Sequence, residues 1–357
     1  MSANVQDVDS SLTSHKFPWK WRISDIENVD KNGCKVFSCF SCGGGSTMGY
    51  KLAGYSVIGN CEIDQDMMKI YRKNHNPQYS YLMDIRDFLK LEDYPDELME
   101  LDILDGSPPC SVFSTVGKRE AGWNTEKKFR EGQKAQRLDD LFFYFIEVAA
   151  KLKPKVVIAE NVTGLLKGNA KGYVNEILKA YGSAGYITQI FKLNAATMGV
   201  PQRRERVFFI SHKKDMELPK LRLDFHENPI LFREVRSDEG ISSAETKYGE
   251  LVRKHFEDGE TSIAKIRGKI GEKESGFGSS VYGDNDVATT LVAVGGAYRG
   301  CDGDYLSVHD CCAIQTFPLD YDFGKESAKY VCGMSVPPVM MANIASEVYK
   351  QWFGEFD

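Results

Sequence analysis

Residues 105–114 read Asp-Gly-Ser-Pro-Pro-Cys-Ser-Val-Phe-Ser, and the rest of the chain is organised around this stretch. Residues 101–104 precede it as a short, mainly apolar run bounded by turn residues, which predicts a buried strand. Gly106 and the two prolines then end the strand and fix a turn. Cys110 should therefore lie just beyond the carboxyl end of a strand, where ligands bind in an open α/β sheet. A cysteine thiolate is a strong nucleophile, although a single cysteine in such a turn is more often a small buried residue.

Composition places the chain among soluble globular proteins. It has 357 residues, of which 42% are hydrophobic and 27% charged, enough for one large domain and a smaller one. No apolar run reaches membrane-spanning length, and residues 1–16 contain no signal-peptide core. The net charge of -6 argues against a surface coated in positive charge but allows a local basic cleft. The 9 cysteines show no metal-type paired spacing and no disulfide framework, so we expect no bound metal and a reducing cytosol. We also expect the protein to be a monomer.

A glycine-rich turn follows the first expected strand. The strand spans Cys34–Phe40, and Cys42–Ser46 then holds three consecutive glycines before a short helix. Such a turn brings backbone N–H groups and a positive helix end against a ligand. The next expected strand, Val57–Cys61, ends at Glu62, where a carboxylate can accept hydrogen bonds from ribose hydroxyls. The turn and the acid together favour a nucleotide-type ligand, whereas either one alone could be purely structural.

Further polar groups follow two later strands. Val156–Ala159 predicts a buried parallel strand that ends at Glu160, whose carboxyl could reach the same substrate as Cys110. Alternating residues share a face of a strand, and three such residues begin the next one: Gln202, Arg204 and Arg206. Guanidinium groups there suit a base carbonyl and phosphates, or they could pair with Glu160 and hold it in place.

These blocks resemble, in the same order, those of the cytosine-C5 DNA methyltransferases. Besides the Pro-Pro-Cys turn, the resemblance covers Phe40–Gly54, Glu160–Val162, Gly199–Arg206, Gln315–Pro318 and Gly333–Pro338. The chain departs from the family's usual pattern at Ser38, Cys42, His309, Asp310 and Met334, where aspartate, glycine, arginine, glutamate and asparagine are common.

The resemblance implies S-adenosylmethionine as cofactor and a covalent mechanism on cytosine. Cys110 would attack C6 of a flipped-out cytosine while Glu160 supports N3, with Arg204 and Arg206 completing the catalytic set. The residues implied to contact the cofactor are Phe40, Gly44, Gly45, Glu62, Ile63, Asp84, Ile85, Pro108, Leu141, Ser335 and Val336.

The expected fold class is α/β, a Rossmann-like methyltransferase sheet with helices on both faces plus a small, irregular target-recognition domain. An N-terminal arm (1–33) precedes the first part of the catalytic domain (34–212), and the recognition domain (213–304) follows. Residues 305–357 return to the catalytic domain, with a C-terminal helix that should pack beside the glycine turn. Within the recognition domain, Ile263–Ile270 resembles an exposed strand.

Duplex DNA is the expected substrate. The stretch after Cys110 is long and has an excess of basic residues, which suits closure on a phosphate backbone, although it could be a solvated surface loop. The residues expected to contact DNA are Ser111, Lys118, Arg119, Lys127, Lys128, Arg130 and Gln202.

Three other functions remain open at this point. Cytosine in structured RNA such as tRNA is one alternative substrate, read by shape and unstacked bases. A catalytically silent DNA-binding relative has no chemical need for Cys110, Glu160 and Arg206 together, and a dinucleotide oxidoreductase leaves the Pro-Pro-Cys turn unexplained. We expect a restriction-modification type of enzyme in the bacterial cytosol or nucleoid.

Overall fold

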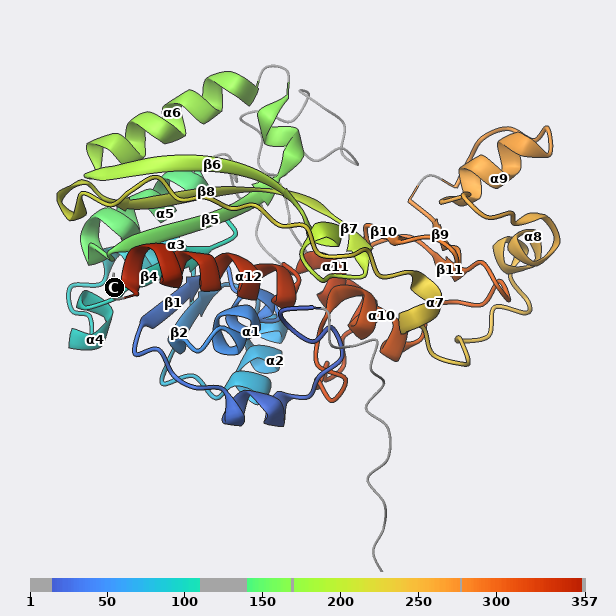
Figure 1. Ribbon diagram of the computed structural model, residues 1–357, viewed down its shortest axis with the longest axis horizontal. Helices are drawn as coiled ribbons and strands as arrows, with labels where there is room; N and C mark the ends of the chain where they lie inside the picture. Colours follow the sequence, from blue (N-terminus) through green and yellow to red (C-terminus); the bar gives the residue numbers. More distant parts are fainter. Residues whose placement is uncertain (1–14, 110–139, 168–169, 277, 355–357) are drawn as a thin grey trace, which may run out of the picture.

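The fold is built on one mixed sheet of seven strands in the order β3-β2-β1-β4-β5-β8-β6 (Figure 1). The computed structural model describes residues 15–109, 140–167, 170–276 and 278–354. The strands are β1 Lys35–Cys39, β2 Ser56–Glu62, β3 Tyr79–Leu82, β4 Ile103–Gly106, β5 Val156–Val162, β6 Tyr186–Asn194 and β8 Glu205–Lys213. All neighbours pair in parallel except β8, which is antiparallel to both β5 and β6. The predicted α/β architecture is therefore present.

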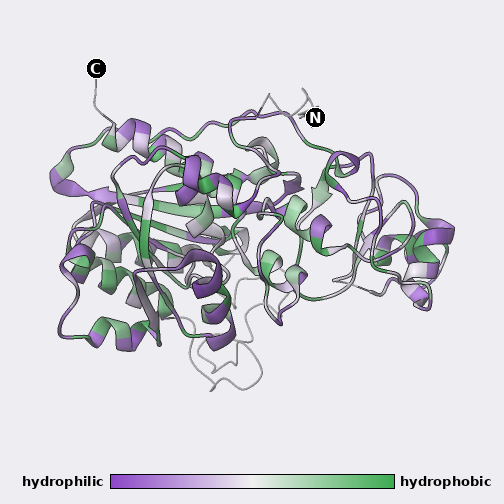
Figure 2. Cartoon of the chain, turned by 90° about the horizontal axis from the view of Figure 1, so that it is seen from below, coloured by the Kyte–Doolittle hydropathy of each residue, from purple (hydrophilic) through white to green (hydrophobic). Residues whose placement is uncertain are grey.

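Alternating apolar residues give the sheet two buried faces. In β4 the side chain of Ile103 packs on one face and that of Leu104 on the other, and both are fully buried. Two helices cover the first face: α1 Gly45–Leu52 and α12 Pro338–Val348. The second face is covered by α3 Ile85–Lys90, α5 Leu141–Leu152 and α6 Ala170–Ser183, and Leu98 of the short helix α4 Asp96–Met99 also packs there. Helices at the rim carry both hydrophobic and hydrophilic residues, as helices with one buried side do (Figure 2).

The chain changes direction across the sheet between β1 and β4. It winds outward from β1 to β2 and β3, with α2 Gln65–His75 between them, and then passes α4 Asp96–Met99 to enter β4 on the other side of β1. The register pairs Cys39 at the end of β1 with Gly106 at the end of β4. The strands that follow β1 and β4 in the chain lie on opposite sides of this pair, and such a point opens a crevice at the carboxyl edge of the sheet.

The C-terminal helix closes the large domain beside the glycine turn, as predicted. A Cβ built on Gly49 of α1 would lie 2.5 Å from both the Cβ of Met341 and the carbonyl oxygen of Pro338 in α12. Glycine is therefore what lets the two helix backbones approach this closely.

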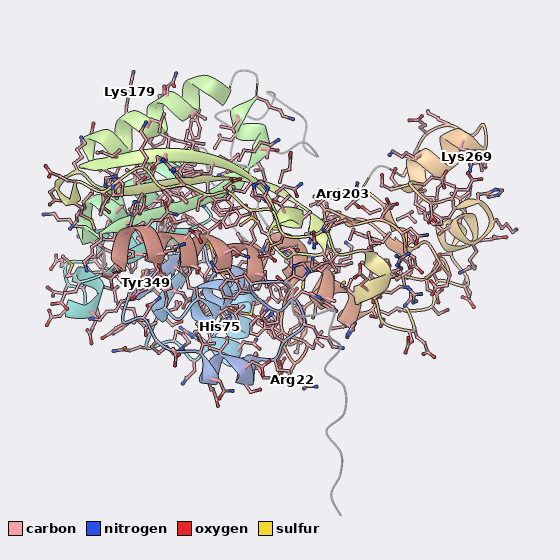
Figure 3. All side chains as sticks on the ribbon, in the orientation of Figure 1. Arg22, His75, Lys179, Arg203, Lys269 and Tyr349 are labelled. Atoms are coloured by element: carbon pink, nitrogen blue, oxygen red, sulfur yellow. The ribbon has the colours of Figure 1, made fainter. Side chains whose placement is uncertain are left out.

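A small lobe, formed by α7–α9 with β9 and β11 (residues 232–299), stands to one side of the sheet (Figure 1). Its elements are α7 Phe232–Val235, α8 Lys247–His255, α9 Ile263–Lys269, β9 Ser280–Tyr282 and β11 Ala297–Arg299. A separate apolar core holds its outer part together, made of Val252, Ile263, Ile266, Val281 and Tyr298. Figure 3 shows Lys269 in the outer part of this lobe and Arg203 at its junction with the large domain.

The prediction of an exposed strand at Ile263–Ile270 is wrong, because this segment contains the helix α9. The Ser262 hydroxyl caps the helix by accepting a hydrogen bond from the Lys265 amide at 3.3 Å. Ile263 and Ile266 lie one turn apart on the same side and are fully buried. The apolar spacing thus follows the helical period rather than the strand period.

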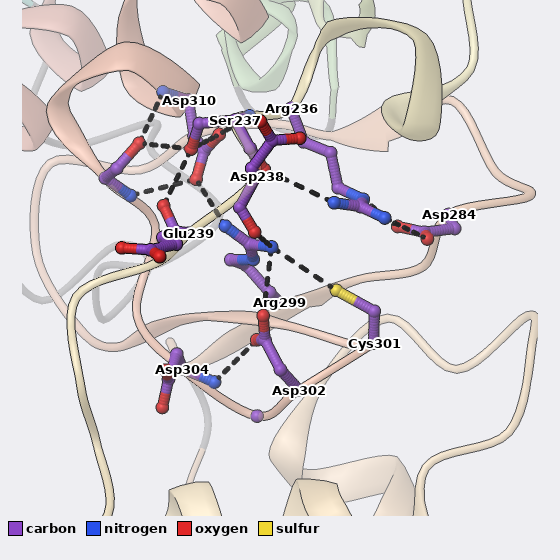
Figure 4. Close-up of polar contacts among 12 residues, drawn as sticks. Arg236, Ser237, Asp238, Glu239, Asp284, Arg299, Cys301, Asp302, Asp304 and Asp310 are labelled. Atoms are coloured by element: carbon purple, nitrogen blue, oxygen red, sulfur yellow. Dashed lines mark hydrogen bonds and ion pairs between the residues drawn. The ribbon is translucent and has the colours of Figure 1, made fainter.

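A buried polar cluster connects the small lobe to α10 Val308–Gln315 (Figure 4). The Asp310 carboxylate accepts hydrogen bonds from the Ser237 amide at 2.6 Å and from the Ser307 amide at 2.9 Å. The Arg299 guanidinium pairs with Asp302 at 2.9 Å and lies 3.8 Å from Asp310. Asp310, where the family often has glutamate, thus joins the return segment to the lobe.

Part of the predicted arm and the first residues of the predicted recognition domain pack against the large domain. The indole N–H of Trp21, in the predicted arm, donates to the Thr316 carbonyl at 2.9 Å. Residues 218–225 pack on the C-terminal helix, where the Trp352 indole N–H donates to the Pro219 carbonyl at 2.9 Å. Within the described residues, no helix is long and apolar enough to cross a membrane.

Replacing Gly49 by alanine should destabilise the protein, because the added methyl group has no room between α1 and α12. We expect a loss of roughly 1–3 kcal/mol in the free energy of unfolding, measured by urea denaturation. Gly182→Ala in α6 is the matched control, since nothing lies within 4 Å of its added Cβ, and it should be neutral or slightly stabilising. Equal effects of the two substitutions would contradict the close helix contact.

Candidate active site

Two adjoining pockets lie at the carboxyl edge of the sheet, beside the ends of β1, β2 and β4. The larger is lined by Phe40, Cys42, Cys61, Glu62, Ile63, Asp64, Met67, Met83, Asp84, Ile85, Ser107, Pro109, Leu141, Tyr330 and Met334. The smaller is lined by Ser38, Phe40, Ser41, Cys42, Gly45, Ser46, Asp105, Ser107, Met334, Ser335 and Val336. Shared walls, including Phe40 and Met334, make them two halves of one cavity.

Most residues that the resemblance assigns to a cofactor line this cavity. The larger pocket takes Phe40, Glu62, Ile63, Asp84, Ile85 and Leu141. The smaller takes Gly45, Ser335 and Val336. Gly44 and Pro108 line neither pocket, and Pro109 takes the place expected for Pro108.

The Glu62 carboxylate is held at the end of β2 by the glycine turn. Its two oxygens accept hydrogen bonds from the Cys42 amide at 2.8 Å and from the Asp64 amide at 2.9 Å. Burial raises the pKa of Glu62, and these amide hydrogen bonds oppose the rise. A carboxylate oxygen can accept more than one hydrogen bond, so Glu62 keeps capacity toward the pocket.

Asp84 has a different environment from Glu62. It caps α3 by accepting from the Arg86 amide at 2.8 Å and pairs with the Arg86 guanidinium at 3.0 Å. Arg86 also bonds Asp140 at 2.9 Å, so α3 is joined to the start of α5 beside the larger pocket. The side chain of Asp84 is thereby fixed in orientation.

Gly44 supports the turn rather than lining the pocket. Its φ of 80° lies in the left-handed region, and a Cβ there would collide with the His75 imidazole. His75 Nε2 lies 3.4 Å from the Gly43 carbonyl oxygen, which also accepts a hydrogen bond from the Tyr321 hydroxyl. Burial lowers the pKa of His75 to about 3, so the ring is neutral at physiological pH.

Glu160 and Arg206 form an ion pair at the same edge of the sheet. Arg206 Nε lies 2.9 Å from Glu160 Oε1, and 15% and 13% of the two side chains is exposed. The antiparallel register of β5 and β8 pairs Arg206 with Val162, two residues beyond Glu160 on the same strand face. Burial lowers the pKa of Arg206, and Glu160 opposes that change. The charged pair is thus partly buried but open on one side.

Asn161 links this strand to the Pro-Pro-Cys turn. Its amide group donates to the Pro108 carbonyl oxygen at 3.0 Å and accepts from the Val162 amide at 2.9 Å. Pro108 is thereby held beside the strand that carries Glu160. Sequence reasoning included Asn161 in a family block but did not find this contact, because the partner lies 53 residues away.

The expectation that Gln202 and Arg204 face the substrate together with Arg206 needs correction. Gln202 is fully buried, and its side chain bonds the Leu291 amide and the Gln315 amide oxygen. The Arg204 guanidinium is 2% exposed and donates to the Leu291, Gly333 and Ser335 carbonyls at 2.9–3.0 Å. Arg204 lies between the two-residue strand β7 Gln202–Arg203 and the start of β8, so regular alternation is interrupted there.

These contacts give Arg204 a positioning task. Leu291 follows β10 Ala288–Thr289, which pairs with β7. Gly333 and Ser335 flank Met334, a residue of the cavity wall, at the C-terminal end of α11 Ala328–Met334. The buried guanidinium of Arg204 therefore joins the segment after β10, at the base of the small lobe, to the wall of the cavity.

The nucleophile and the basic stretch lie outside the described residues. This applies to Cys110, Ser111, Lys118, Arg119, Lys127, Lys128 and Arg130. Their roles remain predictions from the sequence.

The cavity contains residues that sequence reasoning did not assign to it. Cys42, Met67, Met83, Tyr330 and Met334 add polarisable and aromatic surface to its walls. At Cys42 and Met334 the chain departs from the usual family pattern. The resemblance therefore does not assign these two residues to the cofactor. Among the described residues, no group of three His, Cys, Asp or Glu side chains is arranged to hold a metal ion.

Comparisons with known proteins agree with this architecture. The family model described as C-5 cytosine-specific DNA methylase matches residues 34–350. Over 191 residues the chain is 34% identical to the Type II methyltransferase M.NgoPII of Neisseria gonorrhoeae, covering 52% of this chain and 50% of that protein. Over 363 residues it is 29% identical to the Type II methyltransferase M.NgoFVII of the same organism, covering 92% of this chain and 89% of that protein.

The match thus spans about half the length of M.NgoPII and most of M.NgoFVII. Among solved structures, a "putative DNA modification methyltransferase encoded within prophage" of E. coli has a TM-score of 0.65 at 20% identity. That similarity covers 90% of this chain and 100% of that chain, and it confirms the Rossmann-like fold.

Neutral His75 predicts a specific acid sensitivity of folding. Its pKa is lowered to about 3 from the ordinary value of 6.5, so protons bind the unfolded chain first as the pH falls below 6.5. This group should therefore cost about 2 kcal/mol of stability between pH 7 and pH 5. Urea unfolding of the wild type and His75→Gln at both pH values measures the effect. The variant should lose less stability on acidification, and parallel losses would contradict a buried neutral imidazole.

Proposed function

Because the chain belongs to the C-5 cytosine-specific DNA methylase family, we propose that it transfers a methyl group from S-adenosylmethionine to C5 of cytosine in duplex DNA. The observation that carries the proposal is the Glu160–Arg206 ion pair at the carboxyl edge of the sheet. Asn161, next to Glu160 in β5, bonds the carbonyl of Pro108, two residues before Cys110 in the sequence, and the two-part cavity opens along the same edge.

The cavity fits S-adenosylmethionine by the chemistry of its walls. Ile63 and Met334 are large apolar side chains that are 40% and 37% exposed, and both line the larger pocket. A flat adenine ring would cover this apolar surface. Glu62 would accept hydrogen bonds from the ribose hydroxyls, and Asp84 and Ile85 would flank the adenine edge. When bound, the cofactor supplies a methyl group activated by a positively charged sulfur.

The protein residues make the cytosine ring reactive. C5 of cytosine is a weak nucleophile, so the Cys110 thiolate adds to C6 and forms an S–C6 bond. The electron pair of the C5–C6 double bond becomes available at C5, while Glu160 supplies a proton or hydrogen bond at N3. After C5 has been methylated, loss of the C5 proton lets the S–C6 bond break, which restores the double bond and the thiolate.

Arg206 would hold Glu160 in its working orientation. The ion pair fixes one carboxylate oxygen at 2.9 Å and leaves the other for the base. The target cytosine must leave the helix to expose both faces of C6, at a cost of a few kcal/mol.

Contacts to DNA are assigned by position and charge. The basic stretch at Lys118–Arg137 would meet phosphates, and residues 213–304 would read the target sequence. The Type II names of the relatives favour a specific DNA sequence and a modification role in a bacterial cell. These assignments make the small lobe the part that differs among enzymes with different targets.

Methyl acceptor identity is tested by incubating the chain with methyl-labelled S-adenosylmethionine and either duplex DNA or tRNA. We expect label in DNA, at C5 of cytosine after digestion to nucleosides. Label in tRNA alone would replace DNA by structured RNA as substrate, and label in neither would contradict the proposed activity.

Glu160→Gln should lower methyl transfer by about 10²–10⁴-fold, because the amide keeps the shape but cannot hold a proton at N3. Steady-state methylation rates at saturating cofactor measure the loss. Glu205→Gln is the control, since Glu205 is half exposed in the same strand region and pairs only with Lys192 among the described residues. A Glu160→Gln rate close to that of the control would mean that Glu160 is structural.

A further inference from the structure

The smaller pocket contains a single ionisable carboxyl group. Among the described residues that line it, Asp105 is the only one with an acidic or basic side chain, and the others are serine, glycine, cysteine and apolar residues. Asp105 lies near the end of β4, in register with Ser38 of the neighbouring strand β1, at the carboxyl edge of the sheet. A ligand part bound there therefore meets one fixed negative group.

The described contacts of Asp105 do not neutralise its charge. Its carboxylate accepts from the Ser38 hydroxyl at 2.7 Å and from the Tyr50 hydroxyl at 3.3 Å, and it is 3% exposed. Both donors are uncharged, and among the described groups that influence Asp105 no cation occurs. A buried carboxylate without a cation is unfavourable, so it either takes up a proton or pairs with a cationic ligand group.

We propose that Asp105 binds the α-ammonium group of the amino-acid half of the cofactor. This inference rests on the proposed function, because it takes S-adenosylmethionine as the ligand of the joined pockets. The larger pocket accounts for adenosine, so the amino-acid half extends into the smaller one, where Asp105 meets it. An ammonium group brings a positive charge and three donors, the complement that the carboxylate lacks.

Ser38 and Tyr50 are the positioning residues of this arrangement. Ser38 in β1 and Tyr50 in α1 approach Asp105 from two elements and fix its carboxylate at the pocket wall. The alternative is that Asp105 only braces β1 against β4. In that case its loss would weaken every ligand of the cavity alike, or none of them.

The arrangement also predicts a pH dependence. The groups that face Asp105 are Cys39 from β1, Tyr50 from α1, Tyr71 from α2 and Glu160 from β5, none of them a cation. Burial and then the Glu160 charge raise the pKa of Asp105 to about 7, against the hydrogen bonds from Ser38 and Tyr50. An ammonium group favours the ionised carboxyl, so affinity for such a ligand should fall as the pH drops through 7.

The test compares three ligands by isothermal titration calorimetry on the full chain. S-adenosylhomocysteine carries the ammonium group, its deaminated analogue lacks only that group, and 5′-methylthioadenosine lacks the whole amino-acid end. Asp105→Asn should weaken S-adenosylhomocysteine by at least about tenfold and leave the other two unchanged. Asp102→Asn is the matched control: this buried carboxylate precedes the same strand, pairs with Lys155 at 2.7 Å, and should change none of the affinities.

The outcomes separate this inference from the proposed function. Equal weakening of all three ligands by Asp105→Asn, or no weakening of S-adenosylhomocysteine, would overturn the role of Asp105 alone. Failure of the wild type to bind any of the three would overturn the proposed function as well. Should Asp105→Asn not fold, the wild type still decides: S-adenosylhomocysteine must lose affinity between pH 8 and pH 6 relative to its deaminated analogue, and parallel curves would refute the contact.

Discussion

The change of winding direction between β1 and β4 is the constraint on which the rest of the site depends. Because the chain leaves β1 toward β2 and returns for β4 on the other side, the loops after these strands separate and leave an opening. Both pockets lie in that opening. Three strands bring carboxyl groups to this edge of the sheet: Glu62 from β2 and Asp105 from β4 line the pockets, and Glu160 from β5 lies beside them on the strand after β4 in the sheet order. Their environments differ, since backbone amides hold Glu62, hydroxyls hold Asp105 and a guanidinium holds Glu160. One sheet edge thereby presents three acids in three different environments.

The small lobe depends on the same edge through Arg204. A buried guanidinium is stabilised by hydrogen-bond partners, and the Nη1 and Nη2 groups of Arg204 donate to carbonyls at Leu291, Gly333 and Ser335. Its Nε has no hydrogen-bond partner among the described residues. Any shift of the Leu291 segment would leave part of this charge unsatisfied inside the protein, which is costly. The wall of the cavity at Met334 and the base of the small lobe are therefore fixed relative to each other. In the proposed function, this contact would keep the DNA bound by the small lobe at a fixed position relative to the cofactor.

Local patterns predict the sheet because its strands are apolar runs that end at glycine, proline or acidic residues. Glu62 and Glu160 were found for that reason, since each directly ends an apolar run. Long-range partners escaped prediction: the Ser38–Asp105 hydrogen bond spans 67 residues, and no local pattern marks it. Strand alternation predicts that Arg204 faces the substrate, but Arg204 itself lies between β7 and β8, so the alternation does not continue through it. The sequence favours a strand at Ile263–Ile270 because apolar residues recur over a short distance. The isoleucines also fit the helical period, and Ser262 caps the helix that the structure shows.

In the proposed mechanism Cys110 forms a bond to C6 of cytosine while S-adenosylmethionine is bound in the adjoining cavity. Duplex DNA in which cytosine is replaced by 5-fluorocytosine tests it most directly, because fluorine at C5 cannot leave as a proton does and the S–C6 bond then persists. With S-adenosylmethionine present, denaturing electrophoresis should show the chain bound to this DNA, with the modified peptide containing Cys110. No such species should form with Cys110→Ser or without the cofactor. An adduct that survives the Cys110→Ser substitution, or its complete absence from the wild type with DNA that the enzyme methylates, would contradict the account.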